Sequence, residues 1–151
     1  MAAQAWKPYN SALKFIGNGT LPLSGTVFRM SLVTSASNFA TRTIQTFVSL
    51  TNEIADANGY STSGKALANE TWTVGASAKS YRIDADDPIW TATGGAISNI
   101  KGAVIWQSGA SAGARKLLCF ASLTSTQFTL AQNNTLTIQL ATTGILTLST
   151  T

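Results

Sequence analysis

Short apolar segments separated by turns recur along this chain, and their length limits what it can fold into. The run Ile100–Gln107 is almost continuously apolar, and Lys116–Leu123 is a second run of the same kind. Runs of this length, bounded by turn residues, are typical of strands covered on both faces. Their spacing, roughly 8–12 residues, is typical of sandwiches and barrels. We therefore expect an all-β fold, an antiparallel β-sandwich or a jelly-roll-like pair of sheets.

Alternating residues predict further strands. In Thr26–Thr34, the side chains of Phe28, Met30 and Leu32 alternate with those of a second face, which predicts a half-buried strand. Apolar residues within Thr41–Ile54 follow a spacing close to 3.6, and we expect one short helix there. Shorter strands are expected at Ser11–Ile16, Trp72–Val74, Tyr81–Ile83, Ile89–Thr93, Phe128–Leu130, residues 135–140 and Ile145–Leu148.

The first 25 residues differ from the rest, because prolines and glycines interrupt any long element. The 151 residues fit one folded unit, which we divide into an N-terminal arm, residues 1–25, and a β-sandwich domain, residues 26–151. Trp6, Tyr9 and Phe15 in the arm either fold back on the same chain or lie on a neighbouring subunit. We treat them as a candidate interaction arm, and expect its removal to leave the sandwich folded but to weaken attachment.

The chain is poor in charge: 11% of its residues are charged, against an average of about 25%. A surface with so few charges has little electrostatic protection against association, which favours assembly with partners. The alternative is an ordinary soluble β domain with a surface rich in serine and threonine. The net charge is +4, but the ten basic residues are dispersed, so no specific nucleic-acid partner is expected.

The sequence supplies few groups for catalysis. It contains no histidine, which removes the commonest general base and the usual activation of serine or cysteine nucleophiles. The one cysteine, Cys119, lies in an apolar run, which predicts a buried packing residue. We expect neither enzymatic activity nor a cofactor. No apolar stretch approaches the ~20 residues of a membrane span, and no basic, apolar leader is present; we expect synthesis in the cytoplasm and no membrane partner.

One segment partly matches a phosphate-binding loop. Gly59-Tyr-Ser-Thr-Ser-Gly64-Lys65 has the glycine and lysine spacing of that motif, but Ala66 stands where the motif needs serine or threonine. The residues before the segment do not form an apolar strand, and those after it have little helical pattern. The sequence therefore predicts two glycine turns around a polar loop.

Asp84, Asp86 and Asp87 form the one acidic cluster. Such oxygen ligands bind hard cations, but the spacing lacks a central glycine and a closing glutamate. The alternative, which we favour, is a turn in which the aspartate side chains bind nearby main-chain groups and Pro88 ends the loop.

The tryptophans offer a further candidate site. Trp72, Trp90 and Trp106 could form a platform on which sugars stack. Trp106 lies in a continuous apolar run, and we expect it in the core.

From Asn52 to Leu148, the order of segments resembles small structural proteins of tailed bacteriophage virions, of the head decoration, cement or minor capsid type. The segments that carry this resemblance are Asn52–Ile54, Asn58–Tyr60, Gly64, Ile83–Asp87, Trp90–Gly94, Ile100–Trp106, Lys116–Ala121, Leu136–Ile138 and Gly144–Ile145. The resemblance implies a β-sandwich that binds an assembled shell or a neighbouring virion component, often as a trimer.

These observations and the resemblance lead to one expected function and two alternatives. We expect a capsid decoration or cement protein in the virion, bound to the major capsid protein or another virion protein, and homo-oligomeric, with a trimer favoured. The first alternative is a neck, tail or fibre-base component of the phage particle. The second is a carbohydrate-binding β-sandwich.

Overall fold

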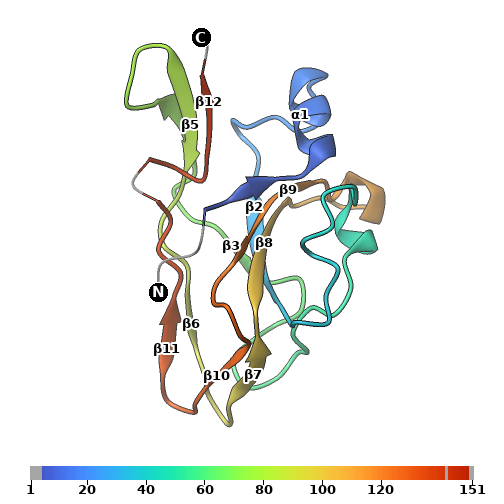
Figure 1. The fold of residues 1–151 in the computed structure, drawn as a ribbon, viewed down its shortest axis with the longest axis vertical. Coiled ribbons are helices and arrows are strands. Elements are labelled where there is room, and N and C mark those ends of the chain that lie inside the picture. The colour runs from blue at the N-terminus through green and yellow to red at the C-terminus, as the bar shows by residue number, and fades with distance from the viewer. Residues whose placement is uncertain (1–4, 142, 150–151) are drawn as a thin grey trace.

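The computed structural model describes residues 5–141 and 143–149 (Figure 1). Strands make up 38% of it and helical segments 10%. Every pair of hydrogen-bonded strands is antiparallel. The expected all-β, sandwich-like fold with one α-helix is confirmed, although the helix does not lie where the sequence pattern predicts it.

A five-stranded sheet forms the centre of the molecule. In order across the sheet, its strands are β1 (Lys7–Pro8), β9 (Leu117–Ser122), β8 (Gly102–Gln107), β2 (Phe28–Val33) and β3 (Lys65–Ala66). The strands β8 and β9 are buried on both faces, as their apolar runs predict. The strand β2 is also buried on both faces, so the expectation of a half-buried strand is wrong. The reason is that Ser31, on the more polar face, is itself buried and accepts a hydrogen bond from Trp106.

The α-helix of the fold is α1 (Asn10–Gly17), inside the segment expected to be irregular. The strand expected at Ser11–Ile16 is therefore wrong. Ala12 and Phe15, three residues apart, lie on one face of the helix and are buried, whereas Leu13 is exposed. The helix contacts β9. Its buried face thus covers part of the central sheet.

The helix expected within Thr41–Ile54 is wrong, because this segment forms no α-helix and contains only a turn at residues 42–43 and one 3₁₀ turn, η1 (Phe47–Ser49). Its main chain instead forms isolated bridges to strands, Thr46 with Lys116 and Glu53 with Val33. The segment is rich in threonine, whose branched side chain lowers helix propensity. Apolar residues here therefore contact the sheet one at a time along an extended path.

Smaller sheets complete the fold. They are β7 (Ile97–Ile100) with β10 (Phe128–Leu130), β6 (Ile89–Thr91) with β11 (Thr135–Thr137), and β4 (Thr71–Val74), β5 (Ser80–Asp84) and β12 (Leu146–Ser149) together. A second 3₁₀ turn, η2, spans Ala112–Ala114. The β6–β11 and β4–β5–β12 sheets follow one another along one side of the molecule, beside the central sheet (Figure 1). Every strand expected from the second half of the chain is present, and most agree within two residues at their ends. The strand expected at residues 135–140 ends at Thr137, and β7 was not expected.

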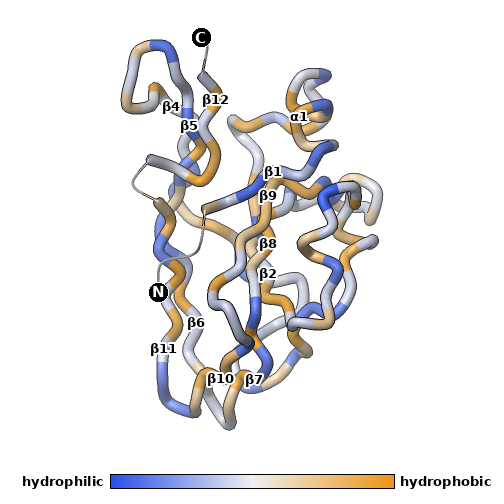
Figure 2. The backbone as a smooth tube through the Cα atoms, in the orientation of Figure 1, coloured by the Kyte–Doolittle hydropathy of each residue, from blue (hydrophilic) through white to orange (hydrophobic). Residues whose placement is uncertain are grey.

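One hydrophobic core joins these layers. It combines central-sheet residues such as Met30 and Ile105 with Ile83 and Trp90 from the neighbouring sheets. Hydrophobic residues follow the central strands and continue into the β4–β5–β12 sheet (Figure 2). That sheet lies at one end of the molecule, and its β4–β5 hairpin projects from it (Figure 1).

Candidate interaction surface

The three aromatic residues of the expected arm contact the chain's own core. Tyr9 is fully buried, and its hydroxyl donates a hydrogen bond to the carbonyl oxygen of Phe39 over 2.7 Å. Phe15 is buried, and Trp6 is half-buried against the same core. Leu21 is buried there too. Trp6, Tyr9 and Phe15 thus fold back on the same chain, the first of the two alternatives, and Tyr9 and Phe15 are core residues.

The loop that resembles a phosphate-binding motif packs against main chain. Gly59 and Gly64 both have positive φ, 88° and 61°. A Cβ atom on Gly64 would lie 2.0 Å from the carbonyl oxygen of Met30, so the loop touches β2 directly. The Lys65 ammonium donates a hydrogen bond to the carbonyl oxygen of Ile89, and a strand, not a helix, follows the loop. The prediction of two glycine turns is confirmed.

The aspartates of the acidic cluster have different partners. Asp84 accepts a hydrogen bond from the Ala85 N–H at 3.0 Å, as expected of a turn. Asp86 accepts one from the Asn69 side chain at 2.6 Å, and Asp87 one from the Leu140 N–H at 2.7 Å. Asp86 and Asp87 thus bind residues distant in the sequence, whereas the sequence predicts only contacts with nearby main-chain groups. Among the described residues, no group of three or more histidine, cysteine, aspartate or glutamate side chains is placed to hold a metal ion.

The tryptophans do not form a common platform. Trp90 and Trp106 are 2% and 1% exposed, so the expected platform of Trp72, Trp90 and Trp106 is wrong. The core position expected for Trp106 is confirmed. Its ring stacks on Phe47 with the centroids 4.1 Å apart, and its Nε1 donates to the Ser31 hydroxyl over 3.1 Å. Trp72 is half-buried and belongs to the β4–β5–β12 sheet.

The Cys119 thiol and the Tyr60 hydroxyl are buried and are held in their neutral forms. Burial raises the pKa of the Cys119 thiol, which disfavours the thiolate that a nucleophile needs. Burial also raises the pKa of the Tyr60 hydroxyl, and the charge of Glu53, 2.7 Å from that hydroxyl, raises it further. The Tyr60 hydroxyl also accepts a hydrogen bond from the Leu32 N–H at 3.0 Å. These groups stabilise the interior.

The β4–β5–β12 sheet has one apolar and one polar face. On the apolar face, Tyr81 lies between Val74 of β4 and Leu148 of β12, and Ile83 lies between Trp72 and Leu146 in the next row. The row around Ile83 is covered, since Ile83 is 1% exposed. In the other row, Val74 is 51% and Tyr81 48% exposed. We call Val74, Tyr81 and Leu148 the apolar row.

Two shallow pockets flank the aromatic residues of this face. Trp72 stacks on Tyr81, with ring centroids 5.8 Å apart and planes inclined by 29°. A pocket of about 300 Å³ is lined by Trp72, Tyr81, Leu148, Ala78, Lys79 and Ser149. A second pocket, of about 240 Å³, is lined by Trp72, Ile16 and the segment Leu21–Ser24. The surface around the apolar row is therefore uneven, because one pocket adjoins Tyr81 and Leu148 and the other adjoins Trp72.

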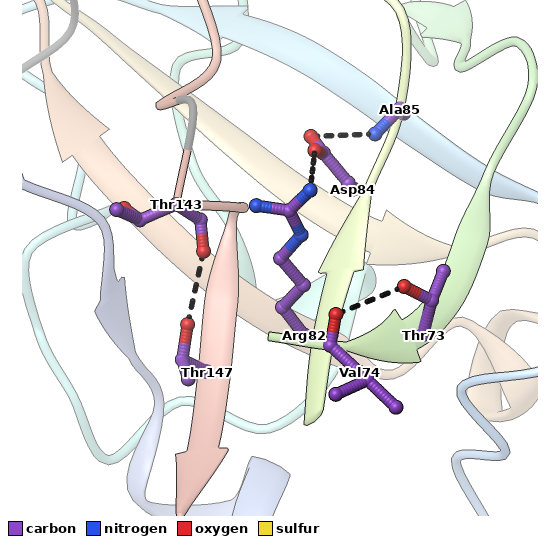
Figure 3. Close-up of polar contacts among 7 residues, drawn as sticks. All are labelled: Thr73, Val74, Arg82, Asp84, Ala85, Thr143 and Thr147. Carbon is purple, nitrogen blue, oxygen red and sulfur yellow. Dashed lines mark hydrogen bonds and ion pairs between the residues drawn. The ribbon is translucent and has the colours of Figure 1, made fainter. Parts of the chain in front are cut away.

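On the polar face of the same sheet, side chains contact one another or nearby main-chain groups. Arg82 forms an ion pair with Asp84 at 3.9 Å, and the Thr147 hydroxyl donates to the Thr143 carbonyl oxygen at 3.1 Å (Figure 3). The Thr73 hydroxyl donates to the carbonyl oxygen of Val74 at 3.1 Å (Figure 3). Thr73 and Thr147 both lie directly opposite Arg82, one on each side. Arg82, Thr73 and Thr147 thus each have a partner within or beside this sheet.

Sequence reasoning predicts the strands of this sheet but misses its exposed apolar row. A signal was present, because Trp72 and Val74 alternate with threonines, and Leu146 and Leu148 alternate with Thr147 and Ser149. Alternation gives each strand an apolar face, but it does not say whether a second layer covers that face. This depends on where the segment Leu21–Ser24 lies, which only the fold reveals.

Comparison with protein-family models, with curated proteins and with solved structures yields no match. Within residues 5–141 and 143–149, no helix has the length and apolar character needed to cross a membrane.

Proposed function

We propose that this chain is a structural virion protein, a capsid decoration or cement protein that binds an assembled phage head and stabilises it. The observation that carries the proposal is the half-exposed apolar row on a sheet at one end of the molecule. Val74 and Tyr81 are large apolar side chains, and neighbouring large apolar side chains left exposed are typical of interaction sites. The resemblance from Asn52 to Leu148 supports the same role.

The remaining chemistry of the chain agrees with a role exerted through surfaces. The side chains that suggest a phosphate loop, a cation site or a nucleophile take part in structural contacts. A protein that stabilises a shell needs a rigid scaffold and interfaces repeated by symmetry. Each interface can be of ordinary size and bury roughly 1,600 Å² of surface. The proposed partners are the major capsid protein or another virion protein, together with further copies of this chain.

Electron microscopy of purified particles tests the proposal, with gold-labelled antibody against this chain. Label spread over the faces of the head supports a decoration protein. Label confined to the neck, the tail or the fibre base supports the alternative location in the particle. Purified particles that contain none of the chain, by labelling and by mass spectrometry, contradict both.

A second candidate function is favoured by one observation, the Trp72–Tyr81 stack beside the pocket of about 300 Å³. Aromatic rings beside a hollow are suited to stacking against the apolar face of a sugar. A glycan panel tests this candidate with the native chain and with Tyr81→Ala, a change at a half-exposed side chain. Binding that the variant loses supports a carbohydrate site, and the absence of binding across the panel contradicts it.

A further inference from the structure

We propose that a second copy of this chain binds along the free edge of β4, so that the two β4–β5–β12 sheets form one continuous sheet about a twofold axis at Thr73. The inference rests on the proposed function in treating this sheet as an assembly surface. It goes further in naming the partner, the strand and the register.

The main-chain groups of β4 establish which residues are available for pairing. At the end of the hairpin, the Gly75 N–H donates to the Ser80 carbonyl oxygen over 2.8 Å. In an antiparallel ladder, hydrogen-bonded and non-hydrogen-bonded pairs alternate, so Thr73 and Arg82, two residues further along, also form a hydrogen-bonded pair. The N–H and C=O groups of Trp72 and Val74 therefore point away from β5. The Val74 carbonyl oxygen also accepts the Thr73 hydroxyl over 3.1 Å, which leaves its second lone pair. Another extended strand satisfies main-chain groups of this kind.

The side chains of β4 are complementary to themselves in one antiparallel register. With the axis at Thr73, Trp72 of each copy lies opposite Val74 of the other, and the two Thr73 residues lie opposite each other. An aromatic residue opposite a β-branched one, and threonine opposite threonine, are both favourable cross-strand pairs. This register also forms its hydrogen bonds between Trp72 and Val74, the residues whose main-chain groups point outward. The apolar rows of the two copies then lie on one face of a single sheet.

Charge favours the same antiparallel arrangement. The strand β4 carries no charged residue, so nothing on the edge itself opposes pairing. The loop at the tip of the hairpin contains Lys79 and no acidic residue, whereas the base of the hairpin carries Glu70, Asp84 and Asp86. Antiparallel pairing places the basic tip of each copy beside the acidic base of the other, as in electrostatically complementary interfaces.

The edges of the central sheet are less suitable. Its edge strands β1 and β3 have only two residues each, and β1 ends in Pro8, which has no N–H to donate. Very short edges and edge prolines are known devices against strand pairing. The four-residue edge of β4 has neither protection.

A matched pair of substitutions tests the inference, because Thr73 and Thr147 both face Arg82 from opposite sides of β5. Thr73→Glu places a carboxylate beside Arg82 in the isolated chain, but places two carboxylates opposite each other across the proposed axis. Thr147→Glu makes the same change beside the same arginine, away from the axis. In sedimentation velocity, we expect the native chain and Thr147→Glu to form dimers, and Thr73→Glu to dimerise with a Kd at least about tenfold higher.

A covalent test uses the same positions. Opposed residues in a non-hydrogen-bonded antiparallel pair have Cα atoms about 4.5 Å apart, within the range of disulfides. The natural Cys119 is buried, so a new cysteine is the accessible one. Thr73→Cys should form a disulfide-linked dimer under mild oxidation, and Thr147→Cys should not. In this step, two thiols are oxidised to one disulfide, and the added oxidant, such as oxidised glutathione, accepts the two electrons and two protons.

The opposite results overturn the inference. These are a native chain that stays monomeric at all concentrations, equal effects of the two glutamate variants, or an assembly broken by Thr147→Glu alone. These results leave the proposed function standing if the antibody against this chain still labels purified particles. A chain that dimerises through Thr73 but is absent from particles contradicts the proposed function and supports the strand pairing.

Discussion

The Tyr9 hydroxyl donates a hydrogen bond to the carbonyl oxygen of Phe39, 30 residues away in the sequence, in the buried interior of the fold. The Tyr9 ring also contacts Phe120 of β9, with the centroids 5.0 Å apart. Tyr9 thus connects the first segment of the chain to a loop and to the central sheet. Tyr9 and Phe15 of the N-terminal segment are therefore part of the core, whereas its prolines and glycines predict an irregular arm.

Removal of residues 1–25 is therefore expected to unfold the chain, which replaces the expectation drawn from the sequence. The deletion removes the buried side chains of Tyr9, Phe15, Leu21 and Leu23. Their burial contributes about 6–12 kcal/mol, comparable with the whole stability of a domain, about 5–15 kcal/mol. A truncated chain that keeps a cooperative thermal transition, followed by circular dichroism, would contradict this account.

Two substitutions on α1 give a finer test of the same point. Phe15 is buried and Leu13 is 53% exposed on the same helix. Phe15→Ala should lower the free energy of unfolding by about 3–5 kcal/mol, whereas Leu13→Ala should change it by less than about 0.5 kcal/mol. Urea denaturation measures both. Equal effects would mean that α1 does not cover the sheet in the way the structure describes.

The glycine at the end of the polar loop is expected to be irreplaceable. Gly64 has a positive φ, and a Cβ atom there would lie 2.0 Å from the Met30 carbonyl oxygen. Gly64→Ala should therefore destabilise the fold by about 2–4 kcal/mol, through strain and displacement of β2. The control is Gly113→Ala, because a Cβ atom at Gly113 meets nothing within 4 Å. A Gly64→Ala variant as stable as this control would show that the loop does not touch β2.

Stability is expected to fall at alkaline pH. Burial raises the pKa of the Cys119 thiol and of the Tyr9 and Tyr60 hydroxyls in the folded state. In the unfolded chain, these groups lose their protons near pH 8.5 for the thiol and about pH 10 for the phenols. The folded state then binds more protons than the unfolded one, so their contribution is complete below these values and is lost as pH rises above them.

Each such group lowers the free energy of unfolding by up to about 1.4 kcal/mol per pH unit. Urea denaturation between pH 7 and pH 11 measures the loss. In Cys119→Ala, the decline should begin nearer pH 10, because only the tyrosines then contribute. A native chain with constant stability up to pH 11 would contradict the buried, neutral state of these groups.

How much of this could be predicted from the sequence depends on the range of the interactions involved. The strands β8 and β9 were predictable, because a strand covered on both faces is apolar along its whole length. The helix was not, because Ala12 and Phe15 are buried by β9, more than 100 residues later in the chain. In Thr41–Ile54, the helical spacing of apolar residues was coincidental, and isolated bridges to Val33 of β2 and to Lys116, just before β9, hold the main chain in another conformation.

The candidate surface was less predictable than the fold. Sequence alternation identifies Trp72 and Val74 as one face of a strand, but the segment Leu21–Ser24, which lines a pocket together with Trp72, lies some 50 residues earlier. Val74 and Tyr81 of the apolar row stay half-exposed. The aromatic residues near the N-terminus suggested an interaction arm by their residue type, but their position in the core depends on tertiary packing.

We propose that another protein covers the apolar row of the β4–β5–β12 sheet in an assembled particle. A cryo-electron-microscopy map of the purified particle, at a resolution that shows side chains, measures this directly. We expect Val74 and Tyr81 to lie against a neighbouring protein or a further copy of the chain. A map in which the chain attaches by other surfaces, and both side chains face open solvent, would contradict it.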